Sequence, residues 1–584
     1  MKHIWISVRG GKVRNIYFVL VLSLALASGL AAQNACNWAV ECGGMGCNEP
    51  TGIDTDIWGN IYVTGFFADT ATFGPYTLTA TTSVAGGANR DVFVAKLSPE
   101  GQFLWVARSF GTFNNVPEAL VTDELGNTYI TGFYQGSITF GDFFLPKYAP
   151  GNYNDADMFV AKLDTNGNWL WAEAVGSTCF ERPAEICLDS DDNLYVCGHF
   201  SNQTNFGDIS ISGETSQGYF IAKANSDGEW QWVRSGGGMG EDYAASIAVD
   251  ASGNVFAAGV YEFETQIGSW IFPGCANNND VWFAKLDTDG NWLWAKAYSS
   301  PGYEYCGDVK TDVEGNCYMR CTVDDSLTVA GTTYIPVGRS LYLYIKHDPD
   351  GNVLSVSPCG SSHPTYYMMM PADATSDGEN LYALGIFTGP SYWGDISLTT
   401  PLGDTGMNIG NKYVALLSGD GTWTDVYQYH VKDPITSGSI CLDGNGGLLV
   451  VTSFSEYADF GEYSFSCPSG IDNIVIAKFN AITPNEDEQL PTVSGLQVTT
   501  YPNPFRDVVQ IELSSQDKYP LKLEVYDLRG RKIREIDAEG YEPGKLSGSW
   551  NGHDSEGKPC ANGIYLIRAE SQAGNISQRV ILMH

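Results

Sequence analysis

Five acidic residues are the first candidates for chemistry in this chain. Glu49 and Glu118 lie five residues before an aspartate, and Glu181, Asp242 and Glu304 lie eight residues before one. Each precedes a stretch that is typical of a β-strand, so we place all five on connections between strands. Carboxylates gathered at the mouth of a cavity can hold a cation or a basic ligand. We expect an acidic rim of this kind, and the alternative is a set of solvated loop carboxylates.

Two further segments imitate the opening of a calcium-binding loop, one at Asp287, Asp289 and Asn291, the other at Asp348, Asp350 and Asn352. An EF-hand loop needs a bidentate glutamate at its twelfth position, where the first segment has Tyr298. Aspartate followed by Gly-Asn is also the composition of a tight hairpin turn. We interpret both segments as turns and expect no cofactor, with calcium at the acidic rim as the open alternative.

Histidine, the usual acid–base catalyst, is scarce: beyond residue 32 it occurs at His199, His347, His363, His430 and His553, and at the last residue, His584. No two of these have the spacing of metal ligands, and no acid–base pair is evident. Two functions remain open: a noncatalytic scaffold that binds a glycan, a protein or a cation, and a glycoside hydrolase or lyase with a loop-assembled site. We favour the first and assign no catalytic residue.

Composition predicts a secreted, strand-rich protein. The 584 residues include 66 glycines and 13% aromatic residues but only 32 lysines and arginines, which is typical of short strands joined by tight turns. The formal charge is −36, and removing the first 32 residues, which carry four positive charges and no acid, would make it −40. Such acidity repels phosphate backbones, so we expect no nucleic-acid partner.

The N-terminus has the pattern of a secretory signal peptide. Basic residues precede the apolar run 16–26, which leads into small residues ending at Ala32, where we predict cleavage. No later segment has 18 consecutive apolar residues, so we expect no transmembrane helix and a monomer that is secreted or held at the outer cell surface.

The 14 cysteines of an exported chain permit disulfides. Cys42 and Cys47 flank a glycine-rich loop that could bring them together, which makes them a candidate pair. Cys317 and Cys321 lie on one predicted strand, about 13 Å apart, which is too far to bridge. No cysteine pair has zinc-site spacing.

The elements that must position these residues are seven copies of one repeat. The segment 287–295 repeats 164–172 almost residue for residue, and a Val-Ala-Lys-like triplet recurs at roughly 60–70 residue intervals, as at 94–96, 160–162 and 476–478. Each copy is predicted to hold four antiparallel strands, with Asp-x-x-Gly turns after the first and third. Units of this kind make the blades of a β-propeller.

The seventh copy ends at Phe479 without a fourth strand, and residues 37–44 match that missing strand in character. We therefore predict an all-β, seven-bladed β-propeller closed by an N-terminal strand, which leaves no open sheet edge. The short turns then lie on one face, and the long loops 77–90, 143–154 and 399–411 lie on the other, where binding usually occurs.

Residues 34–480 resemble the SBBP family of β-propeller repeats, best at 241–255. The fifth and sixth copies depart from the family pattern, since 353–355 and 426–427 replace its Leu-Trp-Ala strand. The resemblance implies a fold rather than a reaction.

A polar, proline-bounded linker at 483–491 separates the propeller, residues 33–482, from a C-terminal domain, residues 492–584. Alternating strands with glycine turns predict a small Ig-like β-sandwich there. Its recurring short blocks are Tyr501, Pro502, Asn503, Pro504 and Phe505, then Gly530, then the Trp-Asn-Gly stretch at 550–552, then Gly563 and Tyr565.

Those blocks, in that order, resemble the type A C-terminal sorting domain of the type IX secretion system. The resemblance implies export across the inner membrane by the signal peptide and recognition by the outer-membrane translocon of that system. It makes the translocon the one expected partner besides the unknown extracellular ligand.

Overall fold

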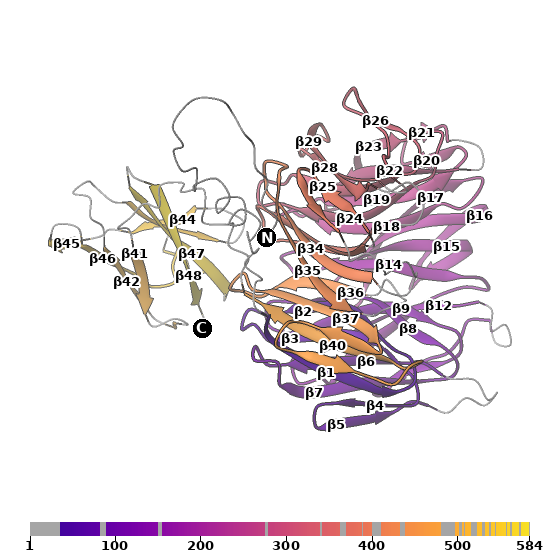
Figure 1. The fold of residues 1–584 in the computed structure, drawn as a ribbon, viewed down its shortest axis with the longest axis horizontal. Coiled ribbons are helices and arrows are strands. Elements are labelled where there is room, and N and C mark those ends of the chain that lie inside the picture. Colours follow the sequence, from indigo (N-terminus) through magenta and orange to yellow (C-terminus); the bar gives the residue numbers. More distant parts are fainter. Residues whose placement is uncertain are drawn as a thin grey trace, which may run out of the picture.

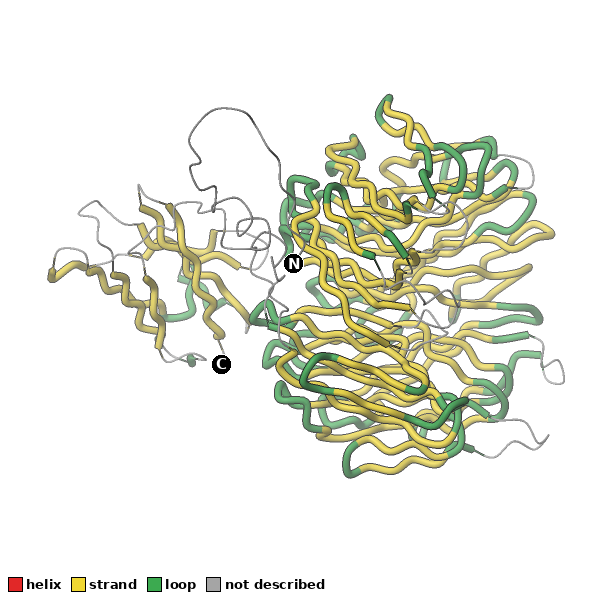
Figure 2. The backbone as a smooth tube through the Cα atoms, viewed as in Figure 1, coloured by secondary structure: helices red, strands yellow, loops and turns green. Residues whose placement is uncertain are grey.

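The protein is built from β-strands. The computed structural model describes residues 36–81, 89–149, 155–274, 278–338, 341–362, 369–387, 389–399, 410–431, 438–480, 497–501, 505–506, 508–514, 522–527, 532–536, 539–542, 545–555, 557–560, 563–571 and 574–582. Figure 2 shows strands and loops in this part of the chain and no helix. A helix long and apolar enough to cross a membrane is accordingly absent from these residues. The predicted signal peptide, its cleavage site after Ala32 and the linker lie outside them.

Within the described residues, seven antiparallel sheets share one order of four strands, and we call each set of four a unit (Figure 1). The first three units comprise β2 (Asn48–Thr55), β3 (Ile61–Phe67), β6 (Asp91–Leu97) and β7 (Phe103–Gly111); β8 (Asn115–Thr122), β9 (Thr128–Tyr134), β12 (Asp157–Leu163) and β13 (Trp169–Val175); and β14 (Glu181–Leu188), β15 (Leu194–Phe206), β16 (Ile209–Ala224) and β17 (Trp230–Gly238).

Units four to six comprise β18 (Tyr243–Val249), β19 (Val255–Glu262), β22 (Asn279–Leu286) and β23 (Trp292–Tyr298); β24 (Glu304–Thr311), β25 (Cys317–Val323), β28 (Leu341–His347) and β29 (Val353–Ser361); and β30 (Met369–Ser376), β31 (Leu381–Phe387), β34 (Gly410–Leu417) and β35 (Trp423–Val431). The seventh unit takes β36 (Gly438–Leu442), β37 (Leu448–Ser455) and β40 (Asp472–Phe479) from the end of this region, and β1 (Cys36–Met45) from its start.

β1 is the fourth strand of the seventh unit. It pairs antiparallel with β40, with Trp38 opposite Lys478 and Val40 opposite Ile476. The pairing of an N-terminal strand with the last repeat, which the sequence predicted, is confirmed. Trp38 also donates its indole N–H to the carbonyl of Pro99 in the first unit, 3.1 Å away, so this strand joins the last unit to the first.

A short hairpin between the second and third strands extends a neighbouring sheet. The separate hairpins are β4 (Thr70–Phe73) with β5 (Tyr76–Thr79), β10 (Ile138–Phe140) with β11 (Phe143–Leu145), β20 (Thr265–Ile267) with β21 (Trp270–Phe272), β26 (Leu327–Val329) with β27 (Thr332–Tyr334), β32 (Ser391–Trp393) with β33 (Ile396–Leu398), and β38 (Tyr457–Asp459) with β39 (Ser464–Ser466).

Five of these hairpins pair with the fourth strand of the preceding unit: β4 with β1, β10 with β7, β20 with β17, β32 with β29 and β38 with β35. The sequence predicted only loops between these strands. Alternating burial explains the difference, since in β4 Ala71 and Phe73 are buried while Thr70 and Thr72 are exposed, the pattern of a strand with one covered face. Each added hairpin covers an edge that would otherwise be open to another chain.

The hydrophobic core of the repeat region lies between units rather than within them. One cluster joins Leu449 and Ile476 of the seventh unit to Ile61 and Phe93 of the first, and the other clusters each join two consecutive units. The third strands β6 and β12 are buried along their whole length because sheets pack on both of their faces. A unit therefore cannot bury its apolar residues without its neighbours.

The first strands lie side by side in sequence order. β2 packs beside β8, β8 beside β14, and so on to β36, which packs beside β2. Residues from all seven first strands line one cavity of about 540 Å³, which we call the central cavity.

Aspartate turns join the first and second strands. In the second unit, the Asp123 carboxylate accepts hydrogen bonds from the backbone N–H of Leu125 (3.1 Å) and of Asn127 (2.8 Å), and from the Asn127 side chain (2.7 Å). Gly126 has a φ of 86°, which glycine adopts without strain. The third-to-fourth connection repeats this at Asp287, which binds Asp289 and Asn291 in the same way. The segments that imitate calcium loops are turns, as predicted.

In most units, a lysine of the third strand ties the turn to its sheet and to the next unit. Lys285 Nζ lies 3.3 Å from Asp250 Oδ2 and 3.3 Å from the carbonyl of Pro349, which also accepts the indole N–H of Trp294. We call this arrangement the lysine staple. Its lysine–aspartate ion pair recurs in five units, at Lys96–Asp56, Lys223–Asp189, Lys285–Asp250, Lys346–Asp312 and Lys478–Asp443. The Val-Ala-Lys triplet found in the sequence is thus explained by packing.

The C-terminal region forms two four-stranded sheets. One contains β41 (Gln497–Tyr501), β42 (Val509–Ser514), β46 (Lys545–Trp550) and β45 (Glu539–Glu542), and the other contains β44 (Lys532–Ile536), β43 (Lys522–Asp527), β47 (Gly563–Ser571) and β48 (Gly574–Leu582). Phe505, Trp550 and Tyr565 share one core cluster with residues of both sheets. The region therefore has its own hydrophobic core.

Candidate ligand-binding site

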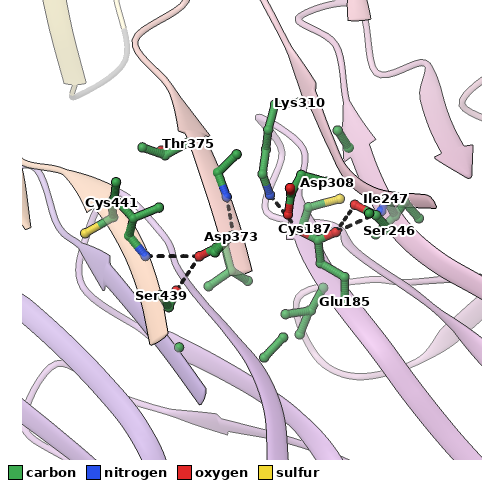
Figure 3. A pocket seen from close by; sticks show the side chains of 18 of the residues that line it. Glu185, Cys187, Ser246, Ile247, Asp308, Lys310, Asp373, Thr375, Ser439 and Cys441 are labelled. Atoms are coloured by element: carbon green, nitrogen blue, oxygen red, sulfur yellow. Dashed lines mark hydrogen bonds and ion pairs between the residues drawn. The ribbon is translucent and has the colours of Figure 1, made fainter. Parts of the chain in front are cut away.

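The central cavity is lined by both acidic and basic side chains. Its charged lining residues are Asp54, Glu118, Glu185, Asp308, Lys310, Arg320 and Asp373. Figure 3 shows the labelled side chains of Glu185, Lys310 and Asp373 entering this space from different strands.

A β-bulge in most of the first strands turns these side chains toward the cavity. The register shifts by one or two residues in β2, β8, β14, β18, β24 and β30, as between Pro183 and Glu185 or between Pro371 and Asp373. Proline has no N–H for the sheet ladder, and a bulge is one of the few places where a strand accepts it.

The cavity carboxylates satisfy backbone groups of the next first strand. Glu185 Oε2 accepts the N–H of Ile247 at 3.1 Å and the hydroxyl of Ser246 (Figure 3). Asp373 Oδ2 accepts the N–H of Ile440 at 3.0 Å. These bonds link neighbouring units across the cavity wall, where no strand pairing exists. The acids therefore have a structural task before any ligand is considered.

The same role belongs to Asp54, which links the first unit to the second. Its Oδ2 accepts the N–H of Thr122 at 2.7 Å. Burial raises the pKa of Asp54 to about 6 and that of Asp373 to about 6, although both carboxyls receive hydrogen bonds that oppose the rise.

Two cations compensate the acids. Lys310 Nζ lies 2.6 Å from Glu185 Oε1, and Arg320 Nε lies 2.7 Å from Asp308 Oδ2. Burial alone would lower the pKa of Lys310, but the carboxylates of Glu185 and Asp373 outweigh it and raise that pKa. Glu185 and Asp308 are thereby held in ion pairs, whereas Asp54 and Asp373 are held by hydrogen bonds.

Three of the five acids predicted to form a rim are fully buried instead. Glu181, Asp242 and Glu304 occupy equivalent positions where a first strand begins, and each has no exposed surface. Glu181 Oε1 accepts the hydroxyls of Ser177 (2.6 Å) and Thr204 (2.8 Å). Burial raises the pKa of Glu181 to about 8, of Glu304 to about 7 and of Asp242 to about 6. The connections fold back over these carboxyls, which sequence spacing could not show.

The other two acids lie elsewhere. Glu118 lines the central cavity and pairs with Arg182, whose Nη2 is 2.7 Å from its Oε1. Glu49, half-buried in β2, accepts the thiol hydrogen of Cys47 at 3.1 Å. The structure does not bring the five acids together into one rim, since only Glu118 reaches the cavity.

The position occupied by Glu181 is filled differently from unit to unit. In the second unit it is Asn115, whose amide lies 3.5 Å from the carboxylate of Asp91. In the third unit it is Glu181, and Asp157 takes the place of Asp91. The neighbouring charge of Asp157 adds to the raised pKa of Glu181. We call the contact between this residue and the preceding third strand the unit junction.

Histidines and cysteines offer little chemistry. Burial lowers the pKa of His199 and of His347 to about 4, so both are neutral at pH 7. Cys42 is a buried free thiol in a core cluster, and Cys47 is a half-buried free thiol. Among the described residues, no group of three or more histidine, cysteine, aspartate or glutamate side chains could hold a metal ion. His363 lies outside those residues.

The sorting blocks are described in part. Tyr501 ends β41, Gly563 begins β47, and Phe505 is buried against Trp550, with ring centroids 5.4 Å apart. Trp550 also packs on Tyr565 at 4.8 Å. Pro502, Asn503, Pro504 and Gly530 lie outside the described residues. The aromatic members of the blocks therefore form a core, a role that their spacing did not reveal.

Lys310, Arg320, Glu185, Asp308 and Asp373 were not singled out from the sequence. One signal could have found them: each is a charged residue inside a stretch that otherwise predicts a strand. A charge that is buried inside a strand needs a partner, and a first strand can supply one across the central cavity.

Residues 499–583 match the family of secretion system C-terminal sorting domains. This domain gives the protein a secreted or cell-surface location. An uncharacterized WD repeat-containing protein of Acanthamoeba polyphaga mimivirus is 23% identical over 239 residues, which is 36% of this chain and only 17% of that relative.

Two solved structures are similar at a low level. A fungal alcohol oxidase with bound copper aligns with a TM-score of 0.38 and 12% identity, covering 94% of this chain and all of the other. PorZ, a surface component of the type-IX secretion system of Porphyromonas gingivalis, aligns with a TM-score of 0.13 and 10% identity over the same shares.

Proposed function

We propose that this chain is a secreted or surface-held, seven-bladed β-propeller of the SBBP type that binds an extracellular ligand without catalysis, and that its Ig-like tail directs it through the type IX translocon. The cyclic order of the first strands and the pairing of β1 with β40 support the propeller. The sorting-domain match at 499–583 supports the route.

The observation that carries the binding role is an exposed apolar group on the connections between units. Met239 is 72% exposed, and Tyr303 and Tyr305 are 44% and 43% exposed. Met239 lies between β17 and β18, and the two tyrosines lie between β23 and β24 or at the start of β24. These connections meet at one end of the propeller, because first and third strands run in the same direction. Exposed apolar side chains at such a place mark interaction sites.

Two acids lie near Tyr305 in this group, which we call the connection patch (Met239, Tyr303 and Tyr305). Glu262 and Asp324 both raise the pKa of Tyr305, after the larger effect of its burial, so they lie close to it. Aromatic rings beside carboxylates suit a neutral sugar or a basic protein surface and disfavour an anion. Glu185 and Asp308 of the central cavity are held in ion pairs with Lys310 and Arg320, which favours binding over turnover.

The test is a glycan and protein array probed with the full mature chain and with a Met239→Ala, Tyr303→Ala, Tyr305→Ala variant. A Leu125→Ala, Val313→Ala variant is the matched control, since these residues are 53% and 54% exposed but lie on aspartate turns at the opposite end. We expect the first variant to lose array signals that the control keeps. Equal signals from both variants, or turnover in a parallel hydrolase screen, would overturn the proposal.

A further inference from the structure

Two cysteines face each other across neighbouring strands of the fifth unit. Cys306 of β24 lies directly opposite Cys321 of β25 in the antiparallel register. Among the described strand pairs, this is the one place where a cysteine opposes a cysteine. Both belong to the same hydrophobic cluster, Cys321 as a buried member and Cys306 packed against it, so the two side chains lie on the same face of the sheet.

The equivalent position in other units shows what kind of strand pair this is. It is Pro50 opposite Gly65 in the first unit, and a proline likewise opposes a glycine at 117/132, 183/198 and 371/385. Proline has no N–H to give to the partner strand, so this position is a non-hydrogen-bonded pair. Opposed Cα atoms of such pairs are about 4.5 Å apart, which lies inside the range of about 4.4–6.8 Å that disulfides span.

The residue opposite this glycine on the third strand changes as well. A Cβ added to Gly65 would lie 2.1 Å from the carbonyl oxygen of Glu49 and 2.8 Å from the ring of Phe93, so that unit requires glycine. Phe93 is the residue opposite Gly65 on the third strand. In the fifth unit, Leu343 is opposite Cys321 in the same way. Proline, glycine and phenylalanine are thus replaced together by cysteine, cysteine and the smaller leucine.

We propose that Cys306 and Cys321 are an oxidation site and form a cross-strand disulfide in the exported protein. Both S–H bonds break and one S–S bond forms, while two electrons and two protons pass to a small disulfide such as oxidised glutathione, which becomes two thiols. An exported protein meets such oxidants, whereas a cytoplasmic one does not. In the structure both residues are free thiols.

The surroundings make this a structural bond rather than a redox centre. Burial raises the pKa of Cys306 to about 12 and holds the pKa of Cys321 well above its usual range, so neither thiol is a ready nucleophile in the folded protein. Cys306 nevertheless lines the central cavity, which gives a small oxidant access. The bond would hold β24 to β25 beside the bulge at Gly307 and Asp308. Four other units have a proline in the place of Cys306.

The direct test uses the full chain purified from the culture medium or the cell surface. The protein is unfolded without reductant, alkylated with N-ethylmaleimide, digested and analysed by mass spectrometry, with and without prior incubation in oxidised glutathione. We expect a linked peptide pair containing Cys306 and Cys321, lighter by two hydrogen atoms than the separate peptides. Full alkylation of both thiols in both samples would overturn the proposal.

Two controls separate this pair from cysteine content in general. Cys187 and Cys197 lie on neighbouring strands of the third unit but oppose Tyr195 and Glu185, so both should be alkylated throughout. A Cys306→Pro, Cys321→Gly variant restores the residues of the first unit, and a Cys306→Ser, Cys321→Ser variant keeps the size. Reductant should lower the melting temperature of the oxidised parent and of neither variant, and an equal fall in all three would contradict the bond.

Discussion

The lysine staple and the unit junction both bury charged side chains between neighbouring units, yet one is repeated and the other varies. Five units place a lysine against the turn aspartate, and the same indole N–H bond to the next unit accompanies it at Trp105, Trp232 and Trp294. At the junction, the second unit has an amide against an acid, the third has two acids, and the fifth has Glu304 beside Asp280.

The difference follows from what each site must satisfy. The staple joins three partners, a turn, a third strand and the next unit, so changing one side chain leaves the other two without their bonds. The junction involves only two side chains. An amide can donate a hydrogen bond to the neighbouring acid at any pH, whereas a second acid can donate one only while it keeps a proton. The staple is therefore repeated because its residues depend on one another, and the junction varies because several residue pairs can fill it.

Removing the strand that joins the last unit to the first should have the largest effect. Deleting Asn37–Glu41 removes most of the pairing between β1 and β40, together with the Trp38 bond to Pro99. We expect the melting temperature measured by calorimetry to fall by more than about 10 °C and light scattering to show aggregation, because the edge of β40 becomes exposed. Trp38→Phe loses the indole hydrogen bond alone, so its melting temperature should fall far less. A deletion variant that melts like the parent would contradict the role of β1 in joining the last unit to the first.

Breaking the staple at one residue should cost less. In Asp250→Ala, Lys285 keeps its buried position without its carboxylate, and the turn loses the hydrogen bonds of Asn254. We expect the free energy of unfolding in guanidinium to drop by about 3–5 kcal/mol. Lys285→Leu copies the sixth unit, where Leu416 stands in the lysine position, and should lose much less. If the two variants lost equal free energy of unfolding, the ion pair, and not the hydrogen bonds of the turn, would account for the effect.

The junction should show the smallest effect, and only at raised pH. The pKa of Glu181 is raised to about 8 from an ordinary 4.5, so the folded state holds a proton that the unfolded state releases. The stability it gives is fully present below about pH 4.5 and is lost as the pH rises through about 8.

Glu181→Gln should remove part of that loss, because the amide donates a hydrogen bond without a proton to release. We expect the variant to exceed the parent by about 1–3 kcal/mol at pH 8.5, measured as the free energy of unfolding across pH 5–9. Glu100→Gln, on an exposed turn, is the control and should follow the parent. A Glu181→Gln curve parallel to that of the parent would show that the junction carries no titrating proton.

The repeat and its turns could be predicted because they depend on neighbours in sequence. Asp-x-x-Gly-Asn encodes its own hydrogen bonds, and the Val-Ala-Lys triplet marks a third strand wherever it occurs. The position of β1 could be predicted for the same reason, because residues 37–44 have the sequence pattern of the fourth strand in the other units.

The site could not be predicted in this way. Glu181, Asp242 and Glu304 have the spacing of a rim, but whether a carboxyl faces water or a neighbouring sheet depends on how the units pack. Lys310 meets Glu185 from a strand 125 residues away, a contact that no local pattern encodes. The hairpins were missed because three- and four-residue strands leave almost no periodic signal.

The position of β1 also sets an order of events during synthesis and export. A chain that emerges from its N-terminus can pair β1 with β4 almost at once, because only some 25 residues separate Met45 from Thr70. The other edge of β1 must wait until β40 has emerged, more than 430 residues later. Until then the chain is a row of stacked sheets with one unfinished end, and a holding chaperone or the translocation machinery would meet that end, rather than the finished protein, as its substrate.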